Sequence, residues 1–368
     1  MLSVFSSPSR YTQGKHATRE LGNEMKKLDL AGPALILAGH SAESFLTDVW
    51  DETFGNAGIK FNVVSFGGEC SNQEIERVKT AASKVNARVV IGAGGGKVLD
   101  TARAVASDLF LPVVNCPTVA SSDAPCSALS VIYDDQGVFE EYRFYARNPD
   151  LVLVDTYVIA QGPVRLLVAG MGDALATMFE AKTCAKGNIA NMRGGTSTQS
   201  AIALAELCYK TLLEDGVAAK QAVQDGIVSP ELERLIEANT LLSGLGFESS
   251  GLAAAHAIHN GLTVASGTHP YYHGEKVAFG TLVQLLLEDK PKQDIEEVLR
   301  FSTQVGLPIT LGEVGLADID SESLSQIATR ATMKGETIHN EPFEVKPTMV
   351  IDAIRAADSL GRNWQSSQ

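Results

Sequence analysis

Short runs of β-branched and aliphatic residues alternate with helical patterns of polar and apolar residues in the first half of the chain. Strands are predicted at residues 34–38, 61–66, 89–92, 112–116, 130–133 and 151–154. Helices are predicted from the end of the first strand to about Trp50, then over residues 73–85 and 98–107. Strands separated by helices form parallel βαβ units. The pattern therefore predicts an α/β sheet with both faces covered.

The pattern changes near Gly162 and Pro163, and the rest of the chain is almost entirely helical in character. Helices are predicted at residues 174–186, 198–213, 230–242, 251–262, 275–288 and 295–304. A length of 368 residues also favours two domains. We therefore predict a Rossmann-like α/β domain with a parallel sheet at 1–162 and an all-α domain at 163–368. With no long linker between them, we expect them to pack tightly, with a ligand in the cleft.

The composition limits the partners and the compartment. The formal net charge is −14, which disfavours nucleic acid and anionic membranes as main partners, although solubility alone also accounts for it. No apolar segment is long enough to span a membrane, and residues 1–14 do not resemble a secretory signal. The five cysteines are scattered, with no Cys-x-x-Cys pair. That usage is typical of a reducing compartment, so we expect a cytoplasmic protein.

Three consecutive glycines, Gly94, Gly95 and Gly96, follow a predicted strand and precede Lys97 at the opening of a predicted helix. Glycine lets a backbone approach a ligand closely and take positive φ angles. The helix N-terminus favours an anion, and Lys97 adds a positive charge. A tight turn without a ligand is the alternative, but such a turn rarely needs three glycines in a row. The segment therefore predicts a diphosphate site, although it matches neither Gly-x-Gly-x-x-Gly nor a Walker loop.

A loop rich in small hydroxyl side chains, residues 116–127, follows the fourth predicted strand. It therefore lies at the carboxyl edge of the sheet, where open α/β folds bind ligands. Its hydroxyl groups are able to bond phosphate, ribose or carboxamide. Taken by itself, the loop is more typical of an ordinary Ser-rich connection than of a ligand site.

Histidines cluster in the second half of the chain. Four of the seven lie within residues 256–273, namely His256, His259, His269 and His273. Such a cluster favours a metal site, since a lone histidine is usually structural. Two imidazoles and one carboxylate would leave positions open for substrate on a catalytic divalent ion. Asp173 is the candidate carboxylate, but a helix N-cap explains it equally well.

Three segments together carry a family resemblance: residues 94–102, 122–133 and 271–280. With them, nearly the whole chain resembles the glycerol dehydrogenase branch of the iron-containing alcohol dehydrogenase family. The resemblance implies a dehydroquinate synthase-like architecture with the active site in the interdomain cleft, and a homo-oligomer, often an octamer. It implies that Asp173, His256 and His273 hold one divalent metal, zinc in this branch with iron as the alternative, and it places Asp123 at the substrate.

The resemblance also implies an NAD site. The implied contacts are Gly96, Lys97, Thr118, Ser121, Ser127, Leu129 and Tyr133, and the predicted set also includes Gly94, Gly95, Asp100 and Val131. One departure concerns the first strand, which usually ends in an aspartate that bonds the adenosine ribose. Here Gly39 and then His40 follow that strand. No arginine lies beside Gly39 in the sequence to bind a 2′-phosphate, so NAD remains favoured over NADP.

The expected reaction is hydride transfer from glycerol, or a related vicinal diol, to NAD. The product from glycerol is dihydroxyacetone. The metal would act as a Lewis acid on two adjacent hydroxyls. His269 is a candidate proton carrier, whereas His259 is interpreted as structural.

A dehydroquinate synthase-like lyase and a glycerol-phosphate dehydrogenase are the alternatives. Both need basic side chains at the substrate, and the segments around the candidate ligands offer only Lys182, Lys186, Arg193 and Lys276. A non-catalytic dinucleotide sensor is disfavoured because it needs no open metal site.

Overall fold

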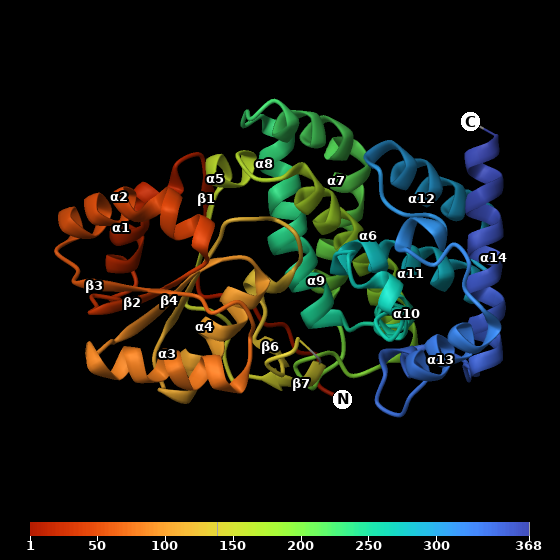
Figure 1. Cartoon of the computed structure of the whole chain (residues 1–368), viewed down its shortest axis with the longest axis horizontal. Coiled ribbons are helices and arrows are strands. Elements are labelled where there is room, and N and C mark those ends of the chain that lie inside the picture. The colour runs from red at the N-terminus through yellow and green to blue at the C-terminus, as the bar shows by residue number, and fades with distance from the viewer. Residues whose placement is uncertain (138, 368) are drawn as a thin grey trace. The chain divides into compact units, whose positions relative to one another are not determined.

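The computed structural model describes residues 1–137 and 139–367, which form two compact units (Figure 1). The α/β unit comprises Ser7–Pro163 and Ala222–Gly244. The helical unit comprises Met1–Ser6, Val164–Gln221 and Leu245–Gln368. The units thus differ from the predicted domains in two segments, residues 1–6 and 222–244, and at Pro163, which belongs to the α/β unit. The domain boundaries themselves stay a prediction.

Six parallel strands form the sheet of the α/β unit. They are β1 (Tyr11–Gly14), β2 (Ala34–Ala38), β3 (Phe61–Ser65), β4 (Val89–Gly94), β5 (Val113–Pro117) and β8 (Leu151–Asp155). Their order is β1-β8-β5-β4-β2-β3, and each neighbouring pair is parallel. The chain winds outward from β2 to β3 and then returns past β2 to β4. The winding direction therefore reverses between β2 and β4, and open α/β sheets bind ligands at the carboxyl edge of such a reversal.

Alternate residues of the central strands enter two separate cores. Ile36 and Ile91 lie in one core with Trp50, which belongs to α2 (His40–Ala57). Leu35 and Leu37 lie in the other, which also contains side chains of α3 (Asn72–Lys84) and α4 (Gly96–Asp108). Figure 1 shows α1 (Leu21–Lys26) and α2 above the sheet, with α3 and α4 below it. Burial on both faces explains why the strands read as continuous apolar runs.

Two strands of this unit were not predicted. The first is β1, whose sequence Tyr-Thr-Gln-Gly is half-buried at the sheet edge. The second is β7 (Phe139–Phe144), a mostly exposed strand with three charged residues. It pairs antiparallel with β6 (Leu129–Tyr133), so the strand predicted at 130–133 is confirmed but lies outside the main sheet. Neither strand has the buried apolar run that marks β2, β4 and β8. After β8 come the short α5 (Thr156–Ala160) and, later in the chain, α8 (Pro230–Glu237) with one π-helical turn, η3 (Ala238–Leu242).

Helices make up nearly all of the regular structure in the second unit. They are α6 (Val164–Gly187), α7 (Gln199–Gln224), α9 (Ser243–Ser250), α10 (Ala254–Leu262), α11 (His273–Leu287), α12 (Lys292–Val305), α13 (Ser321–Ala331) and α14 (Pro347–Ser366). The predicted start of α6 at residue 174 is wrong, because the helix begins ten residues earlier. Among the described residues, no helix is both long enough and apolar enough to cross a membrane.

Candidate functional site

Glycines at three contact points let α6, α10 and α11 approach one another closely. A Cβ atom on Gly274 would lie 1.8 Å from the carbonyl oxygen of Ala169, and one on Gly172 would lie 2.3 Å from that of Gly274. A Cβ on Gly280 would lie 2.4 Å from the carbonyl oxygen of Ala255. Separations this short leave no room for any side chain. These glycines therefore bring the side chains of the three helices into contact.

The structure brings together Asp173 from α6, His256 from α10 and His273 from the first turn of α11. Oδ1 of Asp173 lies 3.3 Å from Nε2 of His256 and 3.1 Å from Nε2 of His273. The three ligand atoms all lie within 4.8 Å of one another. Asp173 lies well inside α6, so the interpretation of this residue as a helix N-cap is wrong. Asp173 is fully buried, but 42% of the His273 side chain is exposed, which leaves one side of the cluster open.

A buried carboxylate orients His256 from the opposite side of its ring. Oε2 of Glu180 lies 2.6 Å from Nδ1 of His256. Oε1 of Glu180 accepts hydrogen bonds from the backbone N–H groups of Ala253 and His256, at 2.8 and 3.0 Å. Because an ionised carboxylate only accepts hydrogen bonds, Nδ1 of His256 carries a proton. When the His256 ring is neutral, its lone pair is therefore on Nε2, the atom that faces Asp173. Sequence reasoning missed Glu180.

His259 orients the other imidazole. Its Nε2 lies 2.9 Å from Nδ1 of His273, and its Nδ1 lies 3.0 Å from Oδ1 of Asn260. Nδ2 of Asn260 donates to Glu336 at 2.9 Å, so Oδ1 of Asn260 is an acceptor that faces a protonated Nδ1 of His259. Nε2 of His259 therefore accepts a hydrogen bond from the Nδ1–H group of His273. The residue interpreted from sequence as structural thus contacts a candidate ligand.

The pKa values around this cluster favour positive charge within it. Burial alone lowers the pKa of His256, but the carboxylates of Glu180 and Asp173 outweigh it and hold this pKa well above its ordinary value. Burial opposes ionisation of Asp173, yet His273 and His256 hold the pKa of Asp173 below its usual range. Burial and the neighbouring His273 lower the pKa of His259, which keeps that ring neutral. Both a proton and a metal cation satisfy this demand.

The donor set at this cluster fits a divalent cation. Two imidazole nitrogens and one carboxylate oxygen lie within 4.8 Å of one another. When both rings are neutral and carry their proton on Nδ1, the lone pairs of these three atoms repel one another unless a cation lies between them. Such a set leaves coordination positions open, as in catalytic sites. His269, the candidate proton carrier, is exposed, and its Nε2 lies 3.3 Å from the carbonyl oxygen of Thr263. Its role stays a prediction.

The glycine turn of the α/β unit connects β4 directly to α4. Gly94 ends the strand, Gly95 is the N-cap and Gly96 is the first helical residue. The expectation of positive φ angles is wrong, because none of the three has one and Gly95 has φ −81°. Gly94 instead permits close packing, since its Cβ would lie 2.7 Å from Val98.

The first turn of α4 has open space above it. A Cβ on Gly95 would find no atom closer than 3.6 Å, and one on Gly96 none closer than 3.8 Å. The first N–H groups of a helix have no partner within the helix and attract anions. This turn therefore offers an anion a cradle that larger side chains would fill, which fits the predicted diphosphate group.

Several of the predicted cofactor residues lie around this turn. The N–H of Thr118 donates to the carbonyl of Gly94 at 3.1 Å. Nζ of Lys97 lies 4.9 Å from the ring centre of Tyr133 and 2.5 Å from Oε2 of Glu69. Asp100 is only 6% exposed, because one of its oxygens accepts from Arg103 and the other from the Val131 N–H at 3.0 Å. Asp100 thus joins α4 to β6.

Buried polar side chains hold the hydroxyl-rich loop in place. Arg103, which is 2% exposed, donates to the carbonyls of Ala124 and Ser127. The two intervening carbonyls also have side-chain donors. The amide of Asn115 donates to the carbonyl of Pro125 at 2.8 Å, and the amide of Asn148 donates to that of Cys126 at 3.0 Å. Each of four consecutive carbonyls thus has a buried donor. Ser127 is itself buried, whereas Ser121 and Leu129 are partly exposed.

A segment more than one hundred residues later in the chain packs on the same loop. The side-chain amide of Asn239 donates to the carbonyl of Ala120 at 3.0 Å, and the hydroxyl of Ser243 lies 3.5 Å from Oδ2 of Asp123. A Cβ on Gly244 would lie 3.0 Å from the Asp123 carbonyl oxygen. Asp123 is partly exposed. Nothing in the local sequence indicated that residues 239–244 would lie here.

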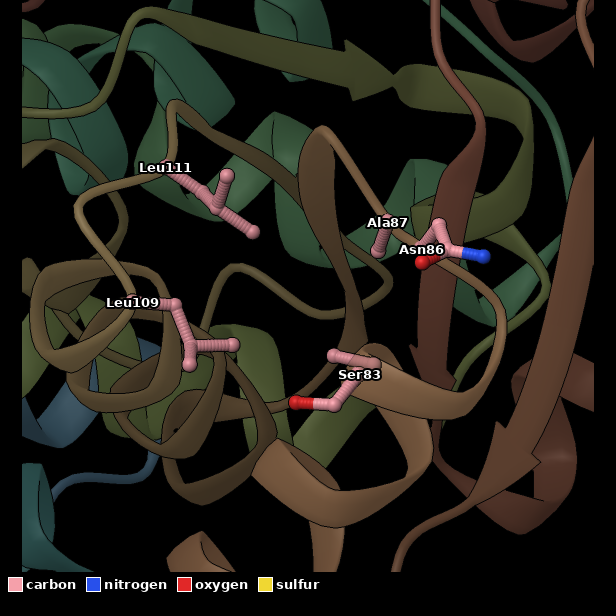
Figure 2. A pocket seen from close by; sticks show the side chains of 6 residues that line it. Ser83, Asn86, Ala87, Leu109 and Leu111 are labelled. Atoms are coloured by element: carbon pink, nitrogen blue, oxygen red, sulfur yellow. The ribbon is translucent and has the colours of Figure 1, made fainter.

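The hollow in Figure 2 lies at a different edge of the sheet. It has a volume of about 310 Å³ and is lined by Ala82, Ser83, Asn86, Ala87, Leu109 and Leu111. These residues precede β4 and β5, so they lie at the amino ends of the strands. The glycine turn lies at the carboxyl ends. The hollow is therefore separate from the predicted cofactor site.

Comparisons with known proteins agree with this fold. The family model for iron-containing alcohol dehydrogenases matches residues 8–156. A glycerol dehydrogenase from Thermotoga maritima is 52% identical, over 98% of both chains. A glycolaldehyde reductase from Halobacterium salinarum is 48% identical, over 98% of this chain and 99% of that protein. The crystal structure of a probable glycerol dehydrogenase from Sinorhizobium meliloti superposes with a TM-score of 0.92 and 41% identity, over 99% of this chain and 100% of that chain.

Proposed function

Because this chain belongs to the iron-containing alcohol dehydrogenase family, we propose that it transfers hydride from glycerol, or a related vicinal diol, to NAD. Glycerol would give dihydroxyacetone. Glycerol dehydrogenases about 50% identical over nearly their full length support the reaction. The accessible first turn of α4 supports a dinucleotide cofactor.

The observation that carries this proposal is the convergence of Asp173, His256 and His273. A divalent cation on these atoms would supply Lewis-acid polarisation, which makes the proton of a substrate hydroxyl easier to lose. We propose zinc as the ion, with iron as the alternative, because nitrogen-rich sets of three ligands suit catalytic zinc. Glu180 and His259 keep both imidazoles in the tautomer that presents Nε2.

The residues of the α/β unit would bind the cofactor and the substrate. Backbone N–H groups at Gly95 and Gly96 would bind the diphosphate, and Lys97 would add positive charge. The remaining predicted cofactor residues and the predicted substrate contact of Asp123 belong to the same proposal. Buried donors to the loop that carries Asp123 favour a fixed position for that carboxylate.

A glycolaldehyde reductase activity is the second candidate, because a relative with that name is 48% identical. Reduction of a hydroxyaldehyde is the reverse of diol oxidation and uses the same hydride exchange. The lyase and the glycerol-phosphate dehydrogenase are not favoured. Two of the four basic residues that could recognise phosphate lie near acidic groups: Lys182 is 2.9 Å from Glu206, and Arg193 is 3.9 Å from Glu248.

Compartment and assembly belong to the same proposal. The five cysteines are buried free thiols, which supports a reducing compartment, and we propose the cytoplasm. We also propose a homo-oligomer, since the family resemblance implies one, often an octamer. Small polyols are the expected partners, and the net charge of −14 disfavours nucleic acid and membranes.

The test is a substrate panel with the full-length protein. Glycerol, 1,2-propanediol, 2,3-butanediol and glycolaldehyde are each assayed with oxidised or reduced NAD, by the absorbance of the reduced cofactor. Chelator-treated protein is compared before and after addition of zinc or ferrous iron. We expect turnover of glycerol that chelation removes and one of the metals restores. Equal turnover in metal-depleted Asp173→Asn protein would overturn the proposal, as would activity on glycolaldehyde alone.

A further inference from the structure

The strand next to the glycine turn, β2, is followed by a glycine, which has no side chain. Gly39 follows β2, and its N–H donates to the carbonyl of Ala93 at 2.9 Å. A Cβ on Gly39 would lie 3.8 Å from the Cα of Gly94, so Gly39 directly adjoins the turn. In dinucleotide-binding folds, a carboxylate beyond the neighbouring strand bonds the adenosine ribose and repels a 2′-phosphate. Gly39 cannot supply that carboxylate.

Glu43 supplies a carboxylate from one helical turn further along. Its N–H donates to the carbonyl of Gly39 at 2.9 Å, within the first turn of α2. The hydroxyl of Ser65, at the end of β3, donates to Oε2 of Glu43 at 2.6 Å. Ser65 pairs in register with Ala38, so this bond holds the carboxylate over the carboxyl ends of β2 and β3. Within residues 1–137 and 139–367, Oε1 of Glu43 accepts no hydrogen bond.

The charges near Glu43 do not neutralise it. Arg77 donates to the backbone carbonyl of Ser65 at 2.7 Å, but its guanidinium also donates to both oxygens of Glu74, at 2.7 Å each. Lys97, at the turn itself, pairs with Glu69. Each of these two cations thus has its own carboxylate. A 2′-phosphate arriving here would meet the remaining negative charge of Glu43.

We propose that Glu43, held by Ser65, accepts hydrogen bonds from the adenosine ribose hydroxyls and excludes NADP. Glu43 begins one helical turn after Gly39, and its side chain is longer than that of the aspartate usually found at the end of this strand. Its carboxylate would therefore fill the role of that aspartate. The proposal rests on the proposed function only in requiring a dinucleotide cofactor bound at the first turn of α4. It assigns the preference for NAD to one side chain outside that turn.

The test measures the dissociation constants of NAD and NADP by calorimetry, without substrate. The variants are Glu43→Gln and Ser65→Ala, with Asp48→Asn as a matched control that changes the same charge on another face of α2. Because hydrogen bonds to charged groups are strong, Glu43→Gln should weaken NAD binding about tenfold. It should also tighten NADP binding several-fold by removing repulsion. Ser65→Ala should shift the ratio in the same direction by a smaller factor, and Asp48→Asn should leave it unchanged.

An unchanged ratio of NAD to NADP affinity in Glu43→Gln would overturn the assignment. Wild-type protein that binds NADP as tightly as NAD would overturn it as well. Because the readout is binding, failure to oxidise glycerol would count against the proposed function alone. Circular dichroism of each variant verifies the fold. Glu43 and Ser65 are not buried, so neither change disturbs a core.

Discussion

Replacing Glu180 by glutamine changes one buried oxygen into an NH₂ group with little change of shape. Glu180 is fully buried and accepts from two backbone N–H groups on Oε1. The glutamine oxygen must take that position to keep both bonds. The new NH₂ group then faces Nδ1 of His256, where Oε2 lay at 2.6 Å. Two donors would oppose each other, so the imidazole must move its proton to Nε2.

That change of tautomer removes the lone pair directed at Asp173, across the present 3.3 Å separation. Loss of a partner that orients a metal ligand typically costs 10–100-fold in affinity. Here the ligand atom itself becomes protonated, which places Glu180→Gln at the upper end. We therefore expect the variant to bind the cation about 100-fold more weakly, which corresponds to about 2.7 kcal/mol of binding free energy.

The assay is competition for zinc against a chromophoric chelator, with circular dichroism to verify folding. Glu206→Gln is the matched control, since Glu206 is an exposed residue of the same unit whose carboxylate pairs with Lys182. The control should bind zinc as the wild type does. A folded Glu180→Gln protein within twofold of the wild-type affinity would refute the reasoning, because it would mean that the tautomer of His256 does not control the cation.

Three further changes test other parts of the structure. His259→Leu removes the hydrogen-bond acceptor for the imidazole of His273, so zinc affinity should fall about tenfold in the same competition assay. His259→Gln should recover part of this affinity. His269→Leu, a change at an exposed histidine, is the control. Gly274→Ala places a Cβ 1.8 Å from a carbonyl oxygen of α6, so chemical denaturation should show a loss of about 3 kcal/mol or more. Burial, and then neighbouring carboxylates, raise the pKa of Glu341 to about 8 from 4.5, so folding becomes less favourable as pH rises between these values. Glu341→Gln should therefore raise Tm at pH 8 and change it little at pH 4, which calorimetry at both values would check.

The elements that could be located from the sequence are those whose residues are buried on both faces and are therefore apolar throughout. The central strands are apolar on both faces, so 34–38 and 89–92 could be located from composition alone. The start of α6 could not, because Gly170 and Gly172 resemble the end of a loop. Gly172 is in fact a close contact between helices, 2.3 Å from a backbone oxygen if a Cβ were added. A glycine that permits packing and a glycine that breaks a helix look alike in a sequence.

The candidate ligands could be proposed because histidines are rare in this chain, and four of seven lie close together. Glu180 could not, because it is one of 44 acidic residues. Its one signal is that it follows Asp173 by seven residues, which places both on the same face of a helix. The contact of His259 with His273 depends on the position of α11 relative to α10, which their sequences do not specify.

The residues that orient the imidazoles distinguish a metal site from a cluster that only resembles one. Asp173, His256 and His273 could also share a proton, since the pKa of Asp173 and the pKa of His256 both favour a positive charge between them. Glu180 and His259 change this balance, because each occupies the Nδ1 side of one ring. Each neutral ring then has only Nε2 available as a ligand. A chain that kept the three ligands and lost both partners would retain the histidines and still bind the cation less tightly.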